Sequence, residues 1–260
     1  MPPPLALIHG FTGSPASWQG VLDALAERPR VVAPPLLGHQ GCAQQAPLSG
    51  GFEAEVDRLA DELRAARVGA GADSSAAPER YHLCGYSLGG RLALGLLLRH
   101  PDLFAGATIV GAHHGLASEG ERRERRASDE RWCALLESEG LDAFIERWEA
   151  LPLFASQASA SPEALRAQRS TRRAQSASGL AASLRTVGLG AMPYYLPRLA
   201  SVAAPVTLLT GALDEKFDAL ACAMREAAPS IAHRRVRGAG HNLILERPEA
   251  IAEALARGAP

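Results

Sequence analysis

The stretch Gly85-Tyr86-Ser87-Leu88-Gly89-Gly90 holds a serine with a glycine two positions away on each side. It follows the apolar run 81–84 and precedes a second apolar run that begins at Leu88. At a sharp turn from strand to helix a serine exposes its hydroxyl, and flanking glycines let the two elements approach without a Cβ clash. The pattern predicts a catalytic hydroxyl at Ser87; the alternative is a glycine-rich turn without a catalytic role.

A serine hydroxyl becomes reactive when a histidine accepts its proton and a carboxylate orients that histidine. Asp214 and His241 follow the last two apolar runs of the chain, in the order serine, acid, histidine. We therefore predict a triad of Ser87, Asp214 and His241. The alternatives are that Asp214 only caps the next helix and that His241 is a buried structural residue. Asp218 is a weaker candidate for the acid.

An oxyanion that forms near the serine needs backbone N–H donors. The first apolar run leads into His9-Gly10-Phe11-Thr12-Gly13, a loop suited to supply one of them. We predict that the Phe11 N–H and the Leu88 N–H form the oxyanion site. The alternative is that His9-Gly10 only makes a tight turn.

Arg91 lies four residues after Ser87, which is about one turn along the predicted helix, so its side chain points toward the mouth of the site. A guanidinium can hold a carboxylate through two parallel hydrogen bonds. A pocket for a neutral ester would not need this group. We predict that Arg91 binds a substrate carboxylate, the alternative being a salt bridge at the surface or to the segment that covers the site.

Six short apolar runs, most of them followed by glycine, alternate with helical patterns along the chain. Strands that are apolar on both faces are typical of a parallel sheet covered by helices. The predicted fold class is α/β, with a mostly parallel, doubly wound sheet and a helical cap inserted between strands. Residues 1–113 and 199–260 form the predicted core, and residues 114–198 form the predicted cap or lid.

The predicted cap carries many arginines, and most of them fit a solvated helix with ion pairs one turn apart. His113 and His114 come just before it, without cysteine or carboxylate in ligand spacing, so no metal site is expected and both histidines are predicted to line a hinge or the pocket wall. The apolar segment 148–154 is predicted to pack the cap onto the core or to line the pocket.

The composition excludes several classes of protein. The 260 residues include 27 Lys and Arg against 28 Asp and Glu, so net charge gives no reason to expect binding to nucleic acid or membrane. The four cysteines are scattered, which argues against a disulfide framework or a zinc site. No apolar stretch reaches the roughly 18 residues of a membrane span, and Met1-Pro2-Pro3-Pro4 does not resemble a signal peptide. We expect a cytoplasmic protein without a cofactor, as a monomer or small homo-oligomer.

Several stretches together resemble the 2-succinyl-6-hydroxy-2,4-cyclohexadiene-1-carboxylate synthases of menaquinone biosynthesis, within the α/β-hydrolase superfamily. They are residues 9–14 with Trp18, 85–91, 121–132, 152–156 and 214–217. The resemblance covers nearly the whole chain. It implies the α/β-hydrolase fold and a lyase that eliminates pyruvate from 2-succinyl-5-enolpyruvyl-6-hydroxy-3-cyclohexene-1-carboxylate, a small polyanionic substrate.

The resemblance also implies the site residues. The family's triad positions fall on Ser87, Asp214 and His241, its substrate-binding arginines on Arg91, Arg125 and Arg169, and its pocket aromatics on Tyr86 and Trp148. In this interpretation Ser87, activated by His241, removes a ring proton, and the oxyanion donors stabilise the enolate that forms.

Two other classes of function remain open. One is a serine hydrolase, either an esterase or a C–C bond hydrolase, that acts on a small acidic substrate. The other is a binding module without catalysis, against which the presence of Ser87, Asp214 and His241 together argues. The sequence differs from the family's usual pattern at residues 36–41 and 112–115, both near the pocket. The chain begins directly at its first strand, so the usual preceding hairpin is not expected.

Overall fold

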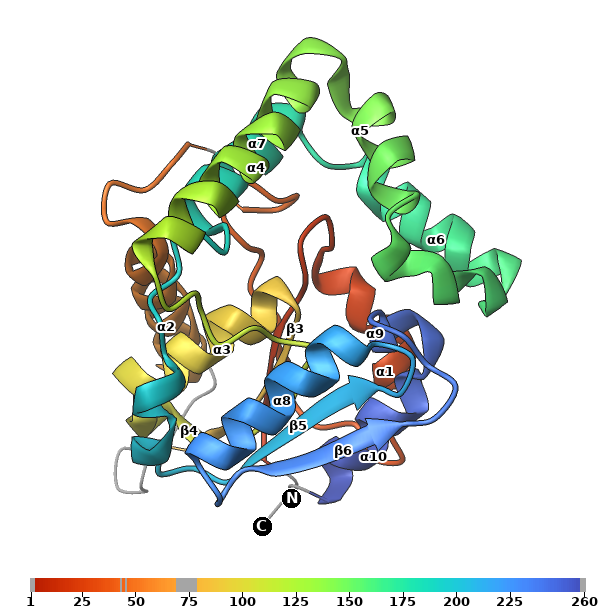
Figure 1. Cartoon of the computed structure of the whole chain (residues 1–260). Helices are drawn as coiled ribbons and strands as arrows, with labels where there is room; N and C mark the ends of the chain where they lie inside the picture. Colours follow the sequence, from red (N-terminus) through yellow and green to blue (C-terminus); the bar gives the residue numbers. More distant parts are fainter. Residues whose placement is uncertain (1–2, 43, 45, 69–78, 258–260) are drawn as a thin grey trace.

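A parallel β-sheet forms the centre of the molecule in the computed structural model, which describes residues 3–42, 44, 46–68 and 79–257 (Figure 1). Its strands lie in the order β2-β1-β3-β4-β5-β6, and every neighbouring pair is parallel. The strands are β1 (Leu5–Ile8), β2 (Val31–Val32), β3 (Tyr81–Tyr86), β4 (Phe104–Val110), β5 (Val206–Gly211) and β6 (Ala232–Val236). The predicted α/β fold with a parallel sheet is confirmed.

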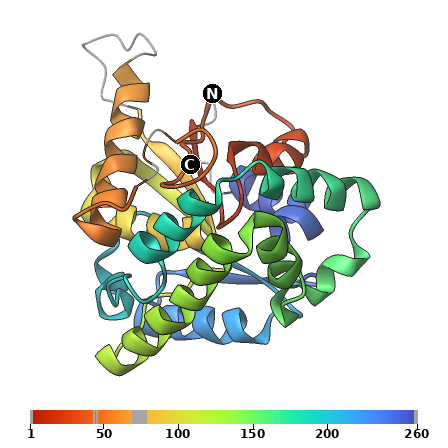
Figure 2. The ribbon, with the colours of Figure 1, turned by 90° about the horizontal axis from the view of Figure 1, so that it is seen from above.

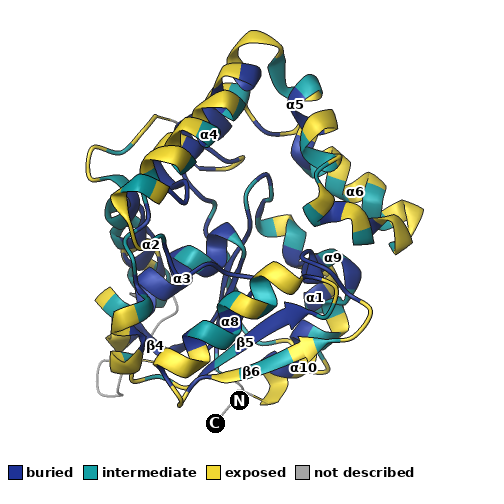
Figure 3. Ribbon diagram, viewed as in Figure 1, coloured by how far each residue is buried: buried dark blue, intermediate teal, exposed yellow. Residues whose placement is uncertain are grey.

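Helices cover both faces of this sheet. Apolar side chains of α2 (Gly51–Val68), α3 (Leu88–Arg99) and α8 (Glu215–Ala227) pack into one core cluster with the strands. The opposite face packs with η1 (Pro15–Trp18), α1 (Gln19–Asp23), α9 (Leu243–Glu246) and α10 (Pro248–Arg257). The central strands β1, β3, β4 and β5 are mostly buried, whereas the edge strand β6 is partly exposed (Figure 3). Burial on both sides explains why the strands are apolar without alternation.

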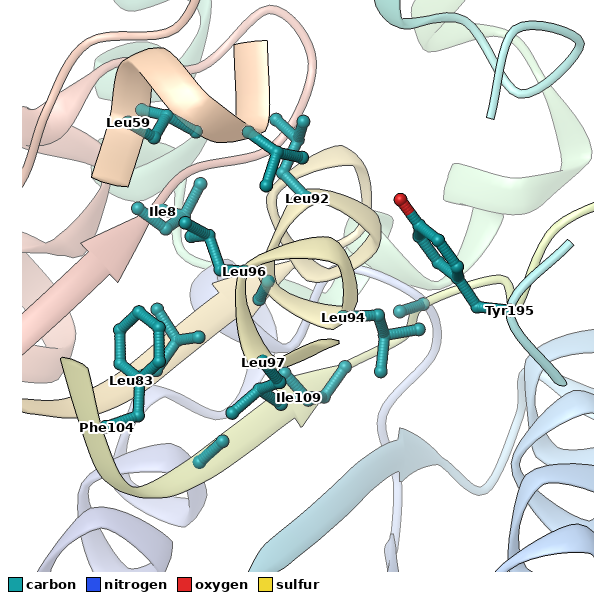
Figure 4. Packing of buried hydrophobic residues seen from close by; sticks show 14 of the residues in the cluster. Ile8, Leu59, Leu83, Leu92, Leu94, Leu96, Leu97, Phe104, Ile109 and Tyr195 are labelled. Carbon is teal, nitrogen blue, oxygen red and sulfur yellow. The ribbon is translucent and has the colours of Figure 1, made fainter. Parts of the chain in front are cut away.

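Helix α3 is apolar almost all round because it is enclosed on several sides. Leu92 and Leu96 lie beside Leu59 of α2 and Ile8 of β1, whereas Leu94 and Leu97 lie toward Ile109 of β4 (Figure 4). All seven side chains are at most 2% exposed. This packing fixes the helix that follows Ser87, and with it the position of the serine.

The cap lies between β4 and β5 in the chain and over one end of the sheet in space (Figures 1 and 2). Its elements are α4 (Glu119–Ser138), α5 (Gly140–Glu149), η3 (Pro152–Ser159), α6 (Pro162–Arg173) and α7 (Ala177–Val187). The cap has its own apolar cluster, which includes Cys133, Leu136, Phe144 and Leu180. The inserted helical cap is therefore present, and its boundaries at residues 114 and 198 stay a prediction. Two short 3-10 helices, η2 (Pro101–Leu103) and η4 (Leu196–Ser201), complete the structure.

Cys42, Cys84 and Cys133 are buried, and Cys222 is partly buried. Within the described ranges, no helix combines the length and the apolar character that crossing a membrane requires.

Candidate active site

Ser87 occupies the turn between β3 and α3. Its backbone φ is 52°, a left-handed value that residues other than glycine rarely adopt. The turn is tight because α3 comes back against the sheet. A Cβ atom on Gly85 would lie 2.4 Å from the carbonyl oxygen of Gly89, and one on Gly89 would lie 2.0 Å from the carbonyl oxygen of Ile8. Only glycine fits at either position, so the strained serine conformation depends on its two glycine neighbours.

Ser87, His241 and Asp214 form one hydrogen-bonded chain. The distance from Ser87 Oγ to His241 Nε2 is 3.0 Å, and the distance from His241 Nδ1 to Asp214 Oδ2 is 2.8 Å. The three residues come from loops after β3, β5 and β6, whose carboxyl ends lie at the same edge of the sheet. With Nδ1–H donated to the carboxylate, Nε2 is free to accept the serine proton.

Asp214 also caps a helix, so its two carboxylate oxygens contact both His241 and the start of α8. Its Oδ1 accepts the N–H of Phe217 at 3.3 Å at the start of α8, while Oδ2 binds His241. Asp218, the weaker candidate for the acid, lies away from the serine and pairs with Arg235 at 2.9 Å.

The loop that carries Phe11 is held by two buried histidines. The Thr12 N–H donates to His39 Nε2 at 3.1 Å, and the Leu36 N–H donates to His9 Nε2 at 3.3 Å. Burial lowers the pKa of His9 to about 3 and that of His39 to about 4, so both rings are neutral and accept these bonds near pH 7. Thr12 itself has a left-handed φ of 64°. The loop is thus fixed from behind, with Phe11 facing the cavity.

A cavity of about 500 Å³ opens in front of Ser87 and His241, between the core and the cap. The core contributes Phe11, Leu88 and Arg91 to its walls, and the cap contributes Arg125 and other residues from α5, α6 and α7. The volume lies within the range of small-molecule sites. Four cationic side chains line the cavity: Arg91, Arg125, Arg172 and Lys216.

Arg91 is a partly buried cation without a carboxylate partner among the described residues. Its Nη1 donates to the Val187 carbonyl oxygen at 3.0 Å. Burial, and then the positive charge of Arg125, lower the pKa of Arg91 to about 9. Arg125 donates from Nε to Asp129 at 2.8 Å, and Asp129 is 5% exposed. No carboxylate in the described part of the chain forms the alternative salt bridge with Arg91, so its guanidinium is available to an anion in the cavity.

The structure brings Arg172, rather than Arg169, to this cavity. Arg169 has an exposed side chain that pairs with Glu149 at 3.0 Å from its Nε. Arg172 is 5% exposed, pairs with the other oxygen of Glu149 at 2.9 Å, and donates from Nε to Thr12 Oγ1 at 3.3 Å. Several arginines follow one another in α6, and sequence spacing alone does not say which of them faces inward.

Tyr86 and Trp148 both line the cavity. The Tyr86 ring centroid lies 5.5 Å from that of His241. Trp148 packs against Phe11 at 5.3 Å and stacks on Phe144 at 5.4 Å, so it joins the cap to the core and also forms part of the pocket wall.

Two further cavity residues had weaker signals in the sequence. His113 accepts the Gly115 N–H at Nδ1, at 3.0 Å, which leaves its proton on Nε2. Burial, and then nearby cationic groups, lower its pKa to about 3, so it is a neutral donor at the cavity.

Lys216 follows the acid by two residues and lies at the rim with an exposed side chain. Over the described ranges, no group of three or more His, Cys, Asp or Glu residues is arranged to hold a metal ion.

Comparison with known proteins shows the family to which the chain belongs. Residues 5–254 match the model of the alpha/beta hydrolase family. A 2-succinyl-6-hydroxy-2,4-cyclohexadiene-1-carboxylate synthase of Salmonella newport (strain SL254) is 36% identical over 255 residues, which cover 98% of this chain and 93% of that protein. A protein of the same name from Citrobacter koseri is 33% identical with the same coverage.

Solved structures show the same fold. MenH from S. aureus superposes with a TM-score of 0.89 at 25% identity, covering 98% of this chain and 92% of that one. A thermophilic esterase from Thermogutta terrifontis shares the fold, with a TM-score of 0.78 at 24% identity. The chain therefore belongs to the alpha/beta hydrolase family and, within it, to the 2-succinyl-6-hydroxy-2,4-cyclohexadiene-1-carboxylate synthases.

Proposed function

We propose that this enzyme, a lyase of the α/β-hydrolase fold by its family, eliminates pyruvate from 2-succinyl-5-enolpyruvyl-6-hydroxy-3-cyclohexene-1-carboxylate in menaquinone biosynthesis. The product is 2-succinyl-6-hydroxy-2,4-cyclohexadiene-1-carboxylate, the compound in the names of its relatives. The observation that carries the proposal is a complete serine–histidine–aspartate chain facing a cavity with cationic walls.

The substrate's negative charges match the cavity's cations. Arg91, Arg125 and Arg172 come from α3, α4 and α6, so they approach one ligand from three directions. Bidentate guanidinium–carboxylate contacts fix both position and orientation. Tyr86 and Trp148 supply flat apolar surface for the ring and the enolpyruvyl group. Holding the leaving group and the acidic C–H in one geometry lowers the entropic part of the barrier.

In the proposed reaction, His241 accepts the Ser87 proton as the serine oxygen removes a proton from the ring. The electron pair of that C–H bond forms the new ring double bond through an enolate, and the C–O bond to the enolpyruvyl group breaks. The Phe11 and Leu88 N–H groups would stabilise the enolate oxygen. The released enolpyruvate takes up a proton and becomes pyruvate. No acyl-enzyme forms on this path, in contrast to hydrolysis.

The test is to mix purified protein with the enolpyruvyl substrate and to follow pyruvate with lactate dehydrogenase and NADH. Wild-type protein should release one pyruvate per substrate, and Ser87→Ala should lower kcat by roughly a thousandfold while the fold is kept. Absence of pyruvate from folded wild-type protein with intact substrate would contradict the proposal.

A serine hydrolase acting on a small acidic substrate is the second candidate, because the 3.0 Å contact of Ser87 Oγ with His241 Nε2 also suits a nucleophilic serine. Turnover of p-nitrophenyl esters with a burst of one equivalent per enzyme, together with no pyruvate release, would favour this function.

A further inference from the structure

Glu246 places a buried carboxylate directly behind the catalytic histidine. Its side chain belongs to the short helix α9, five residues after His241, and is 7% exposed. Oε2 accepts the N–H of Gly240 at 2.8 Å, and Oε1 accepts the N–H of Asn242 at 3.2 Å. One carboxylate therefore holds the backbone on both sides of His241, while Asp214 holds its ring.

The same carboxylate also reaches the cap. Ser156, in η3, donates its hydroxyl to Glu246 Oε1 at 3.1 Å. The approach is so close that a Cβ atom on Gly240 would lie 2.0 Å from Ser156 Oγ. Phe154 of the same cap segment lies 6.5 Å from His241 between ring centroids, and the hydrogen bond from this segment toward the histidine loop is made through Glu246. The position of the cap and that of His241 are thus connected through two side chains.

The chemistry at this position requires a carboxylate. Three donors converge on it, two of them backbone N–H groups, and none of the described Lys, Arg or His side chains forms an ion pair with it. A carboxylate accepts at both oxygens, whereas an amide of the same size has one accepting oxygen and an NH₂ group that only donates. An amide here would oppose a donor to at least one of the three N–H or O–H groups.

We propose that Glu246 is a positioning residue for His241, and that its bond to Ser156 ties the alignment of His241 with Ser87 to the seating of the cap. Glu246 touches neither substrate nor the reacting atoms in this role. The inference rests on the proposed function only where turnover is measured, because the alignment of His241 with Ser87 can be followed without the natural substrate.

The experiment compares wild type with Glu246→Gln and Ser156→Ala in two assays. A fluorophosphonate reacts with the serine only when the histidine accepts its proton, so the rate of Ser87 labelling reports the alignment whatever the substrate is. Glu246→Gln should lower both the labelling rate and kcat for pyruvate release roughly ten- to hundredfold, because small misplacements of catalytic groups cost that much. KM should stay within about twofold, since the cation-lined walls are untouched. Ser156→Ala keeps both backbone bonds and should lower both rates by a smaller factor, about two- to fivefold.

Ile251→Val serves as the matched control, because Ile251 is buried in the adjacent helix α10 and its side chain has no hydrogen-bonding group. It should lower Tm and leave labelling unchanged. If Glu246→Gln lowers Tm as Ile251→Val does and labels Ser87 at the wild-type rate, Glu246 is merely structural and the proposal is overturned. Should Glu246→Gln not fold, wild-type labelling of Ser156→Ala would overturn it as well. Slow labelling of Glu246→Gln in a protein whose wild type releases no pyruvate would uphold the proposal and reject the proposed function instead.

Discussion

At the scale of single residues, the proposed binding of a substrate carboxylate depends first on Arg91. It projects from the first turn of α3 beside Ser87 and has a backbone carbonyl group, not a carboxylate, as its partner. A partly buried cation that has no carboxylate partner among the described residues is less stable in the empty protein than after an anion binds. The lowered pKa of Arg91, caused first by burial and then by Arg125, has the same origin.

Arg91→Met should therefore weaken substrate binding without destabilising the fold. Losing a charge-assisted contact costs about 1.5–3 kcal/mol, so KM should rise roughly ten- to hundredfold. Tm should stay equal or rise, because the unpaired buried charge is gone. Arg99→Met at the exposed end of the same helix removes contacts to Asp57 instead, and should leave KM unchanged. Steady-state kinetics and thermal melts check both variants; an unaltered KM in Arg91→Met would rule out the carboxylate contact.

Two arginines of α6 give a matched comparison at the same scale. Arg172 is buried at the cavity and Arg169 is exposed on the far side of Glu149. Arg172→Gln should lower kcat/KM roughly ten- to hundredfold, whereas Arg169→Gln should stay within about twofold, since only the former removes a cation from the pocket. An equal decrease of kcat/KM in the two variants would contradict the assignment of Arg172, rather than Arg169, to the cavity.

At the scale of elements, the hydrogen bonds that hold the loop after β1 depend on the protonation state of His9 and His39. His9 and His39 accept backbone N–H groups only while they are neutral, and burial lowers their pKa to about 3 and about 4. In the unfolded chain a histidine has a pKa of about 6.5. Between these values the unfolded state binds protons that the folded state does not, so stability is present above pH ~6.5 and is lost as the pH falls toward about 4.

In His39→Gln, the free energy of unfolding should decrease less steeply as the pH falls. Glutamine keeps an acceptor for the Thr12 N–H but does not titrate. The free energy of unfolding, measured by urea titration at pH values between about 6 and 5, should depend on pH with a slope smaller by about 1.4 kcal/mol per pH unit than in wild type. Parallel curves for the two proteins would mean that His39 is protonated in the folded state over this range.

For the molecule as a whole, the formal net charge of -1 hides an uneven distribution. The cavity between core and cap is lined by three arginines and a lysine, although acidic and basic residues nearly balance over the chain. The proposed polyanionic substrate would be attracted by this local field rather than by the net charge, and salt would weaken the attraction most at exposed groups such as Lys216.

KM for the enolpyruvyl substrate should accordingly rise several-fold when NaCl increases from about 0.1 M to about 1 M, while kcat changes by less than about twofold. Lys216→Gln should show a weaker salt dependence, because it lacks the exposed cation at the rim. Initial rates across a salt series measure both quantities. A KM that does not respond to salt in either protein would contradict electrostatic capture of an anion.

The order of strands and loops in the sequence was enough to predict the fold class and to predict that Ser87, Asp214 and His241 lie together, as their hydrogen bonds show. This is possible because each residue follows an apolar strand, and parallel strands end at one edge of a sheet whatever the details of packing. The glycines around Ser87 are also a local signal, because a Cβ atom at Gly85 or Gly89 would clash with nearby backbone oxygen atoms.

Only the tertiary structure decided which cap arginine faces the cavity and that Glu246 lies behind His241. Arg169 and Arg172 share one helix, and which of them turns inward depends on how α6 packs against the loop of Thr12 and on Glu149 of α5. Glu246 is an ordinary acidic residue in the sequence until its side chain meets Gly240, Asn242 and the distant Ser156. Contacts of this kind join segments that are far apart in the chain. Hydrophobic pattern and spacing predict local secondary structure and do not predict such contacts.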